Sequence, residues 1–321
     1  MKSYELPNNV LTSVPEPLVS VRTSTYNHGK YIRQCIEGVL MQKTDFPFEY
    51  IIGEDCSTDD TMAIVKEYAE KYPDVIRVVT ADRNVGMRGN GERCISMCRG
   101  KYVAICEGDD YWTDPYKLQR QVDYMEAHPE CPICFTSQDA YLQESESFVR
   151  DTCQEIVYYD ERDMIRANWV GTLTSLTRAS IISEYKDEIQ SRIPDFPLGD
   201  WTMWLYCSMI GRIVKLPEVT GVYRVLQHSA SHTTDTVKQM RFIVETYRMR
   251  EYFNRLLGIN KRWMRFRTYR DAVRFSVRYA KERKERVLPL LCKTLLYVIK
   301  NPVSKPSREF RNRVAQLLQK Y

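Results

Sequence analysis

Residues 102–110 read Tyr102-Val103-Ala104-Ile105-Cys106-Glu107-Gly108-Asp109-Asp110, an apolar run that ends in acidic residues. The apolar part has the length and composition of a buried β-strand. Similar runs occur on both sides of it, and patterns of helical spacing separate them. The predicted strands are residues 18–23, 49–53, 75–80, 102–106 and 132–136, and the predicted helices are residues 30–41, 61–71, 91–98 and 115–127. This alternation predicts an α/β fold with a mostly parallel, Rossmann-like sheet and helices on both faces.

The second half of the chain has a less regular pattern. Residues 137–195 mix short elements, residues 200–210 predict a helix, and residues 212–225 predict a strand pair that turns at Pro217. Beyond Asp235 nearly everything is helical, with predicted helices at 237–257, 261–284, 287–300 and 307–318. We therefore expect a sheet domain of residues 1–235 and a basic helical C-terminal region of residues 236–321.

The charge of the chain is distributed unevenly between these two parts. Residues 1–235 hold 24 basic and 36 acidic side chains, a net of −12, whereas residues 236–321 hold 23 and 6, a net of +17. Basic helices that carry interleaved aromatic residues are typical of helices that lie on anionic membranes. The alternative is that these arginines face solvent or pair with the acidic part of the chain. No nucleic-acid recognition module is visible, so a nucleic-acid partner is not expected.

Two further features concern location and the cysteines. The first residues carry no cationic segment followed by an apolar run, and no apolar stretch approaches the ~20 residues that span a bilayer. We expect a cytoplasmic protein whose basic helices are candidates for contact with the inner face of the cell membrane. Cys131 and Cys134 form a C-x-x-C pair without a second pair to complete a zinc site, so we interpret them as small buried side chains.

Polar residues follow three of the predicted strands. The strands run into Ser24-Thr25-Tyr26-Asn27, Glu54-Asp55 and Glu107-Gly108-Asp109-Asp110. In open parallel sheets, ligands bind at the carboxyl ends of the strands. Adjacent aspartates repel each other unless a cation such as Mg²⁺ or Mn²⁺ compensates, and the alternative is a solvated acidic loop. The absence of a G-x-G-x-x-G or Walker lysine motif argues against a dinucleotide dehydrogenase and a phosphate-loop ATPase.

Four segments resemble, in order and spacing, the signatures of family 2 glycosyltransferases. They are Ser20-Val21-Arg22-Thr23-Ser24-Thr25-Tyr26-Asn27, Ile51-Ile52-Gly53-Glu54-Asp55-Cys56-Ser57-Thr58-Asp59-Asp60-Thr61, Asn84-Val85-Gly86 and Glu107-Gly108-Asp109-Asp110-Tyr111-Trp112. The resemblance covers about residues 17–232. It implies the GT-A fold and an inverting enzyme that uses a nucleotide-sugar donor and a divalent metal, Mn²⁺ or Mg²⁺.

The resemblance also implies roles for individual residues at the donor site. The residues expected to surround the nucleoside and ribose are Ser24, Thr25, Tyr26, Asn27, Asp55 and Asp109, with Asp55 on the base. Asp110 would hold the metal on the diphosphate. The segment between Arg88 and Arg93 departs from the family pattern, and either Arg88 or Asn90 is expected to meet the nucleotide.

Two more roles fall in the later part of the chain. The segment Leu198-Gly199-Asp200-Trp201 resembles the one that bears the catalytic base, so Asp200 is expected to deprotonate the acceptor; the alternative is a helix N-cap. Some family members place a histidine metal ligand two residues after the arginine that corresponds to Arg224. Leu226 stands there in this chain, so His232, rather than His228, is the preferred metal ligand.

The implied function is transfer of a sugar, with a UDP-sugar as the expected donor, to a hydroxyl of a glycan or lipid-linked acceptor in cell-envelope polysaccharide synthesis. A nucleotidylyltransferase is one alternative, but it would normally show an early Gly-rich loop with a basic residue, which residues 18–30 lack. A non-catalytic nucleotide-sugar-binding or scaffold protein is the other, and hydrolysis of a UDP-sugar in the presence of Mn²⁺ would distinguish it from an enzyme.

Overall fold

The computed structural model describes residues 3–7, 16–226, 235–258 and 305–321, with single positions between 270 and 292. The chain divides into two compact units. The first comprises Met1–Tyr159, Trp169–Glu184 and Gly211–Val225, and the second comprises Asp160–Asn168, Tyr185–Ile210 and Leu226–Tyr321. The helices expected at 261–284 and 287–300 fall almost entirely outside the described residues, and the domain boundary expected at residue 235 stays a prediction.

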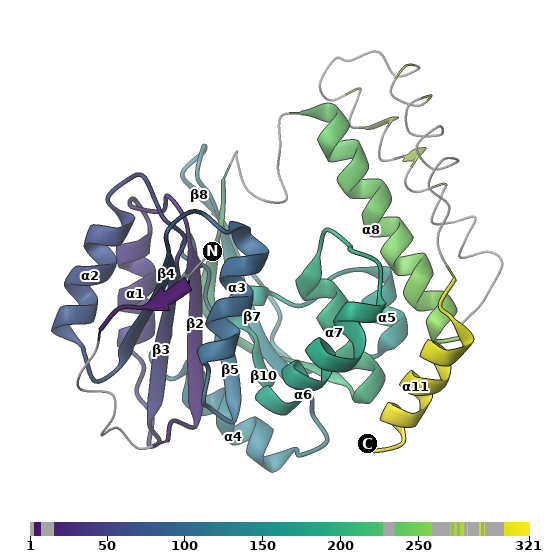
Figure 1. Ribbon diagram of the computed structural model, residues 1–321, viewed down its shortest axis with the longest axis horizontal. Helices are drawn as coiled ribbons and strands as arrows, with labels where there is room; N and C mark the ends of the chain where they lie inside the picture. Colours follow the sequence, from purple (N-terminus) through teal and green to yellow (C-terminus); the bar gives the residue numbers. More distant parts are fainter. Residues whose placement is uncertain are drawn as a thin grey trace. The chain divides into compact units, whose positions relative to one another are not determined.

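The first unit is built on one mixed sheet (Figure 1). Its strands are β1 (Ser3–Glu5), β2 (Val19–Thr25), β3 (Phe48–Glu54), β4 (Ile76–Ala81), β5 (Tyr102–Ile105), β6 (Tyr111–Trp112), β7 (Ile133–Leu142), β8 (Ser147–Val149), β9 (Val157–Tyr159), β10 (Leu176–Arg178) and β11 (Ile213–Val225). They lie in the order β1-β4-β3-β2-β5-β10-β7-β11-β6, with β8 paired to β7 and β9 paired to β11.

The predicted mostly parallel sheet is confirmed for the long strands. The pairs β2/β3, β2/β5, β3/β4 and β7/β11 are parallel. The short strand β10 pairs antiparallel with both β5 and β7, so β7 and β11 run in the same direction as the strands on its other side. The carboxyl ends of β2, β3, β5, β7 and β11 therefore point toward the same edge of the sheet.

Helices cover both faces of this sheet, as the strand–helix alternation predicts. The helices of the first unit are α1 (Ile32–Leu40), α2 (Thr61–Lys71), α3 (Gly86–Met97), α4 (Lys117–Ala127) and α6 (Ala179–Glu184). Helices α1, α2 and α4 pack on one face in the main hydrophobic core, whereas α3 packs on the opposite face against Ile51 and Val79. Each fully buried aliphatic side chain in these layers contributes roughly 1.5–3 kcal/mol.

Two predicted elements differ from the structure. The expected turn at Pro217 is wrong, because β11 continues from Ile213 to Val225 as one strand beside β7. Its pairing is irregular between Leu216 and Gly221, which absorbs the proline without ending the strand. Helix α3 begins at Gly86, five residues before the predicted start at Gly91. The glycines of this helix weaken its sequence pattern because glycine is a poor helix former.

The second unit is helical in its described part. Its elements are α5 (Glu161–Arg166), a π-helical turn (Tyr185–Ile189), a 3₁₀ turn (Gln190–Arg192), α7 (Gly199–Ile210), α8 (Thr236–Leu256) and α11 (Arg308–Leu318). Arg250 on α8 donates through Nε to the Ile165 carbonyl oxygen at 2.5 Å, and Arg313 on α11 forms an ion pair with Glu188 at 2.5 Å. Some arginines of the basic C-terminal region thus bind groups of their own chain.

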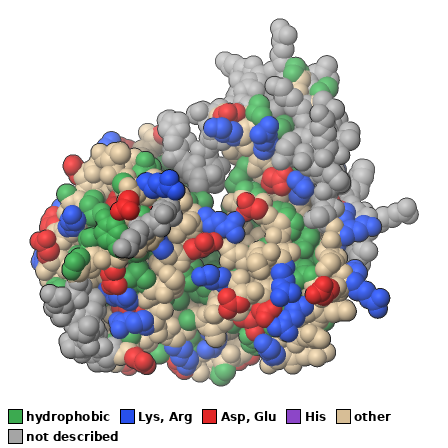
Figure 2. Space-filling view, in the orientation of Figure 1, with side chains coloured by type: hydrophobic (Ala, Val, Ile, Leu, Met, Phe, Trp, Pro, Cys, Tyr) green, Lys and Arg blue, Asp and Glu red, His purple; other side chains and the backbone are tan. Residues whose placement is uncertain are grey.

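The described surface carries both kinds of charge. Figure 2 shows Lys and Arg side chains interspersed with Asp and Glu over the described part of one face. The thiols of Cys131 and Cys134 are free and buried, as interpreted from the sequence, and burial raises the pKa of Cys131 to about 12. Among the described residues, no helix combines the length and the apolar character needed to cross a bilayer.

Candidate functional site

The carboxyl ends of three neighbouring strands form the candidate site. The amide of Asp55, after β3, donates to the carbonyl oxygen of Thr25 at 3.0 Å, and the amide of Gly108, after β5, donates to the carbonyl oxygen of Ser24 at 3.2 Å. These bonds hold the ends of β3 and β5 on either side of the end of β2. The polar segments that follow the strands, residues 24–27, 54–55 and 107–110, are thus brought together at one edge of the sheet, and we use the word crevice for this group of residues.

The acidic turn, residues 107–110, follows β5 in the crevice. The amide of Asp110 donates to the carbonyl oxygen of Glu107 at 3.0 Å, and the side chain of Asp110 is 4% exposed. Burial raises the pKa of the Asp110 carboxyl well above its usual range, and the neighbouring Asp109 and Glu107 carboxylates raise it further. A buried acid among other acids is the arrangement that a divalent cation with oxygen ligands stabilises.

Arg224, at the end of β11, fixes the conformation of this turn. Its backbone amide donates to Oδ1 of Asp110 at 2.7 Å, and its Nε donates to the carbonyl oxygen of Asp109 at 2.9 Å. The two Nη atoms donate to the side-chain oxygens of Gln34 and Gln143 at 2.8 and 3.2 Å. The side chain is buried, and its guanidinium lies over the rings of three tyrosines, Tyr31, Tyr111 and Tyr141. Arg224 therefore holds both aspartates of the turn: its backbone amide binds the carboxylate of Asp110, and its side chain binds the backbone carbonyl oxygen of Asp109.

Asp55 is buried and already bonded within the chain. Its carboxylate accepts hydrogen bonds from the amides of Val85 and Gly86, both at 2.9 Å, and from Nη2 of Arg93 at 3.4 Å. Gly86 has a φ of +84°, a conformation that favours glycine, and its amide therefore reaches the carboxylate at the start of α3. Asp55 thus joins the end of β3 to the start of α3.

The residues of α3 divide between surface and interior. Arg88 is exposed and pairs with Glu92 at 3.1 Å. Asn90 is buried and donates to the carbonyl oxygen of Gly53 at 2.7 Å, while its own oxygen accepts from Nε of Arg93. Arg93 is 9% exposed, and its Nη1 is a buried donor without a hydrogen-bond partner in the described part of the chain. Of these residues, Arg93 lies against Asp55.

The loop after β2 supplies both structural bonds and unpartnered polar atoms. The oxygen of Asn27 accepts from the amide of Thr58 at 2.8 Å, which ties this loop to the loop after β3. Tyr26 is exposed, and the hydroxyl of Ser24 accepts from Arg22 at 3.3 Å. Oγ1 of Thr25 and Nδ1 of His28 are buried and have no hydrogen-bond partner within the described ranges.

Thr25 and His28 also lie against the acidic turn. A Cβ placed on Gly108 would meet Oγ1 of Thr25 at 2.6 Å and Nδ1 of His28 at 2.8 Å, so only glycine fits between them. Burial lowers the pKa of His28, although the Asp109 and Asp59 carboxylates act in the opposite direction. Buried polar atoms without partners are uncommon in folded proteins, so these two atoms are candidates to bond to a ligand.

Asp200 belongs to the second unit and stands in the first turn of α7. It is half-buried, and its Oδ1 accepts from the amide of Trp201 at 2.7 Å. Trp201 is buried, and its Nε1 donates to the carbonyl oxygen of Met164 at 2.8 Å, which fixes the start of α7 against α5. The Asp200 carboxylate therefore lies at a helix N-terminus whose position is fixed by the bond from Trp201.

The expected metal ligands are only partly covered by the structure. Asp110 is described, whereas His232 and the alternative His228 lie outside the described residues. Among the residues that the structure describes, no group of three or more His, Cys, Asp or Glu side chains is arranged to hold a metal ion. Asp110, Asp109 and Glu107 offer carboxylate oxygens, the ligand type that Mn²⁺ and Mg²⁺ prefer, but within the described ranges they do not form a three-ligand group.

Three residues of the crevice were not singled out as site residues from the sequence: Arg224, His28 and Arg93. The separation of 114 positions between Arg224 and Asp110 leaves no local pattern that could connect them. His28 and Arg93 each follow a predicted site position closely, and an ionisable residue next to such a motif is the signal that could have indicated them.

Comparisons with known proteins agree on one family. The model of the family described as "Glycosyl transferase family 2" matches residues 20–179. The putative teichuronic acid biosynthesis glycosyltransferase TuaG of Bacillus subtilis is 33% identical over 221 residues, which cover 67% of this chain and 82% of that protein. An uncharacterized protein of Mycobacterium tuberculosis is 35% identical over 226 residues, covering 68% of this chain. This chain spans only 62% of the length of that mycobacterial relative.

Solved structures show the same fold at low sequence identity. Residues 1–349 of TarS from S. aureus, in complex with UDP-GlcNAc, match with a TM-score of 0.55 and 15% identity over 94% of this chain and 92% of that one. The mannosyltransferase PcManGT from Pyrobaculum calidifontis, in complex with GDP-Man and Mn²⁺, matches with a TM-score of 0.54 and 16% identity over 95% and 79% of the two chains. With the sheet order, the acidic turn after β5 and the relatives taken together, the chain belongs to glycosyl transferase family 2 and has the GT-A fold.

Proposed function

We propose that this glycosyltransferase moves a sugar from a UDP-sugar to a hydroxyl of a glycan or lipid-linked acceptor, with inversion at the anomeric carbon. The observation that carries the proposal is the acidic turn at the crevice, where the buried Asp110 is held by the backbone amide of Arg224. The choice of donor is supported by the TarS complexes with UDP and UDP-GlcNAc.

In this proposal the crevice binds the donor through groups that the chain leaves available. Oγ1 of Thr25 and Nδ1 of His28 lie beside the acidic turn and would bond to the nucleotide or the sugar. Asp55, fixed by the amides of Val85 and Gly86, would present its remaining lone pairs to the base. Asp109 would lie near the ribose. Because the amides of Val85 and Gly86 already orient Asp55, binding of the base would cost little reorganisation of this carboxylate.

The transfer itself would be a single displacement. Asp200 would accept the proton of the acceptor hydroxyl while that oxygen forms a bond to the anomeric carbon. The bond from the anomeric carbon to the diphosphate oxygen breaks, and UDP leaves with the electron pair. The amide of Trp201 donates to Oδ1 of Asp200 at 2.7 Å in the first turn of α7, and this bond would orient the carboxylate.

Asp110 would hold a divalent metal, Mn²⁺ or Mg²⁺, with His232 as a further ligand. Such an ion stabilises the negative charge that develops on the diphosphate leaving group. The complex of PcManGT with GDP-Man and Mn²⁺ supports a metal in this fold.

The biological role that fits is cell-envelope polysaccharide synthesis, which the name of the relative TuaG supports. The net charge of +17 over residues 236–321 would place the enzyme on an anionic membrane where lipid-linked acceptors reside. Flotation with vesicles that contain anionic lipid tests this location. We expect salt-sensitive binding that vesicles of neutral lipid do not support, and equal recovery with both kinds of vesicle would contradict it.

The activity is tested by release of UDP from UDP-glucose, UDP-GlcNAc and UDP-galactose, with and without Mn²⁺. We expect Mn²⁺-dependent UDP release from at least one donor, even slowly with water as the acceptor. If calorimetry shows that the protein binds these donors without turning them over, the scaffold alternative holds instead. If no nucleotide binds, the proposal fails.

A further inference from the structure

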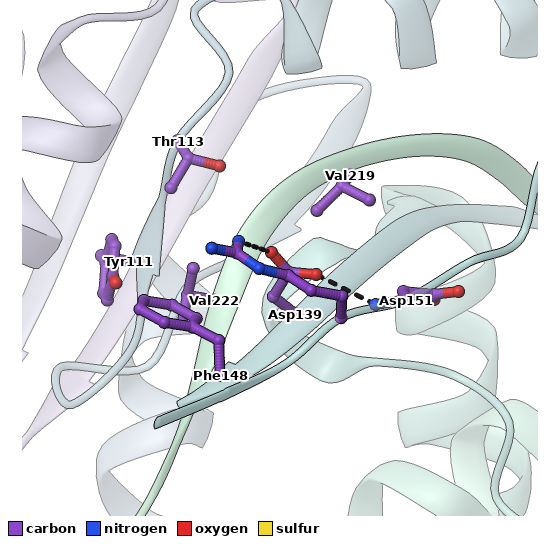
Figure 3. A pocket seen from close by; sticks show the side chains of 8 residues that line it. Tyr111, Thr113, Asp139, Phe148, Asp151, Val219 and Val222 are labelled. Carbon is purple, nitrogen blue, oxygen red and sulfur yellow. Dashed lines mark hydrogen bonds and ion pairs between the residues drawn. The ribbon is translucent and has the colours of Figure 1, made fainter. Parts of the chain in front are cut away.

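A pocket of about 430 Å³ lies in the first unit beside the acidic turn (Figure 3). Tyr111 and Thr113 lie on one side of the pocket, Asp139, Val219 and Asp151 lie on the other, and Phe148 and Val222 lie between them. Arg150 completes the lining. No role follows for this pocket from the donor site described above.

Strands β6 and β11 connect the pocket to the acidic turn. Tyr111, which directly follows Asp110, pairs with Val222 on β11, and Val222 pairs in turn with Asp139 on β7. Residues that are directly opposite each other on neighbouring strands carry their side chains on the same face of a sheet. Arg224 lies two positions beyond Val222, and its guanidinium lies 5.2 Å from the centre of the Tyr111 ring. The ring of Tyr111 therefore lines the pocket and also faces the arginine that holds Asp110.

The position of the pocket along the strands also fits ligand binding. Asp139 and Val222 lie in the carboxyl-terminal parts of β7 and β11, toward the edge at which parallel sheets bind ligands. Val219 lies within the irregular pairing between Leu216 and Gly221, where it is 36% exposed. Bulges of this kind often stand next to active sites, where they re-aim a side chain.

The charged groups of the pocket are fixed by one another. The carboxylate of Asp139, which is 5% exposed, pairs with the guanidinium of Arg150 and accepts from the amide of Asp151 at 3.0 Å. Asp151 in turn accepts from Nζ of Lys215 at 2.7 Å. Although burial acts to raise the pKa of Asp151, the hydrogen bonds from Lys215 and from the amide of Cys153 lower it, so the carboxylate stays charged near neutral pH.

The balance of charge identifies the kind of ligand. Two carboxylates are matched by two cationic side chains, so the pocket carries no net positive charge that would select a diphosphate. The ring of Phe148 is 42% exposed and stacks with the Arg150 guanidinium, which lies 4.3 Å from the ring centre. An exposed aromatic ring beside fixed hydrogen-bond acceptors and donors suits a molecule with one apolar face and many hydroxyls.

We propose that this pocket is an acceptor subsite that binds one neutral pyranose ring of a glycan. The inference rests on the proposed function, because an acceptor must lie close to the donor's sugar. In it, Asp139 and Asp151 accept hydrogen bonds from ring hydroxyls, Arg150 donates to ring oxygens, and Phe148 packs against the C–H face of the sugar. The shared Tyr111 joins this subsite to the acidic turn.

Ligand-observed saturation-transfer NMR on the full chain tests the subsite. The probes are methyl glycosides of β-glucose, β-galactose and β-N-acetylglucosamine, with UDP and the diamagnetic Mg²⁺ present. We expect saturation transfer to at least one glycoside, strongest at the protons of one ring face. Phe148→Ala should weaken that signal at least about fivefold, and Asp139→Asn should do the same. Because Phe148 is exposed, its variant reports on the pocket even if Asp139→Asn fails to fold.

Tyr116→Ala is the matched control, because Tyr116 is another exposed aromatic residue, 46% exposed, that lies against the cations of Lys43 and Arg120 outside the pocket. Its signal should equal that of the unchanged protein. No transfer to any of the three glycosides, or equal signals from Phe148→Ala and the control, would overturn the subsite. Calorimetry of the same proteins with UDP and Mn²⁺ separates the two proposals. UDP binding without glycoside binding contradicts the subsite alone. If the unchanged protein does not bind UDP, the proposed function is contradicted.

Discussion

The backbone amide of Arg224 donates a 2.7 Å hydrogen bond to the carboxylate of Asp110, 114 positions earlier in the chain. The bond joins the end of β11 to the acidic turn after β5. Because it comes from the backbone, it survives replacement of the arginine side chain. The side chain adds a second connection through its bond to the carbonyl oxygen of Asp109. The conformation of the turn therefore depends separately on the backbone and on the side chain of Arg224.

Replacement of Arg224 by alanine tests the contribution of the side chain. The variant loses the bonds to Asp109, Gln34 and Gln143, and hydrogen bonds from charged donors are worth about 1.5–3 kcal/mol each. We expect a lower free energy of unfolding and an affinity for UDP with Mn²⁺ that falls about tenfold, measured by calorimetry. Arg224→Lys should recover only part of the affinity because lysine lacks the planar fork.

Arg178→Ala is the control for this variant. Arg178 on β10 also donates from a part-buried guanidinium to backbone carbonyls, those of Cys131, Met125 and His128, far from the strand ends of the crevice. It should lose stability but keep the UDP affinity of the unchanged protein. Equal losses of UDP affinity in both variants would mean that Arg224 acts through global stability alone.

Asp200→Asn tests the assignment of the catalytic base. The amide can still accept the hydrogen bond from the amide of Trp201, so α7 should keep its first turn. It cannot accept the acceptor's proton, and loss of a general base typically lowers the rate about 10²–10⁴-fold. We expect UDP affinity within about twofold of the unchanged protein and sugar transfer reduced by that factor. Asp195→Asn, five residues earlier and exposed, should transfer normally. Near-normal transfer by Asp200→Asn would reject the base.

Lys117 predicts a dependence of stability on pH. Its ammonium is fully buried, donates to Gln121 at 2.6 Å and lies 4.1 Å from the centre of the Trp112 ring. Burial lowers its pKa to about 7 from the usual 10.5. Between these values the unfolded chain binds a proton that the folded chain does not, so the free energy of unfolding rises with pH over this window. The slope is about 1.4 kcal/mol per pH unit.

Lys117→Met should remove this part of the slope. Guanidinium unfolding followed by tryptophan fluorescence between pH 7.5 and 9 measures it, and the exposed Lys66→Met serves as control. We expect the slope to drop by about 1.4 kcal/mol per pH unit in the first variant only. A slope unchanged by Lys117→Met would show that the lysine stays charged in the folded protein.

The parts of the fold that the sequence predicts are those with local patterns. The strand and helix at 49–53 and 61–71 match β3 and α2 closely because apolar spacing and the Asp59 side chain, which accepts from the amide of Thr61 at 3.0 Å, are encoded within a few residues. The crevice follows from the rule that parallel strands end at one edge. The polar segments at 24–27, 54–55 and 107–110 are therefore brought together as expected.

What the sequence does not predict depends on distant contacts. Pro217 indicates a turn, yet pairing with β7 carries β11 past it, and the irregular register removes the cost of its missing donor. Lys117 has the sequence character of a surface residue in a first helical turn, but the packing of α4 buries it beside Trp112. The role of Arg224 likewise depends on sheet order, which places β11 next to β6.

We propose that the buried Asp110 carboxyl holds a cation on the donor's diphosphate. Asp110→Asn keeps an acceptor for the amide of Arg224 but removes the charge. Burial raises the pKa of this carboxyl, so its ionisation at neutral pH lowers the stability of the folded protein. Asparagine carries no charge, and the variant should therefore be at least as stable as the unchanged protein.

Titration of UDP into both proteins by calorimetry, with and without Mn²⁺, tests this role of Asp110. For the unchanged protein we predict that Mn²⁺ strengthens UDP binding, and for Asp110→Asn that this gain is lost by at least the roughly 10–100-fold typical of damaged metal sites. If Mn²⁺ strengthens UDP binding equally in the folded Asp110→Asn protein, the cation is held elsewhere and the account is contradicted.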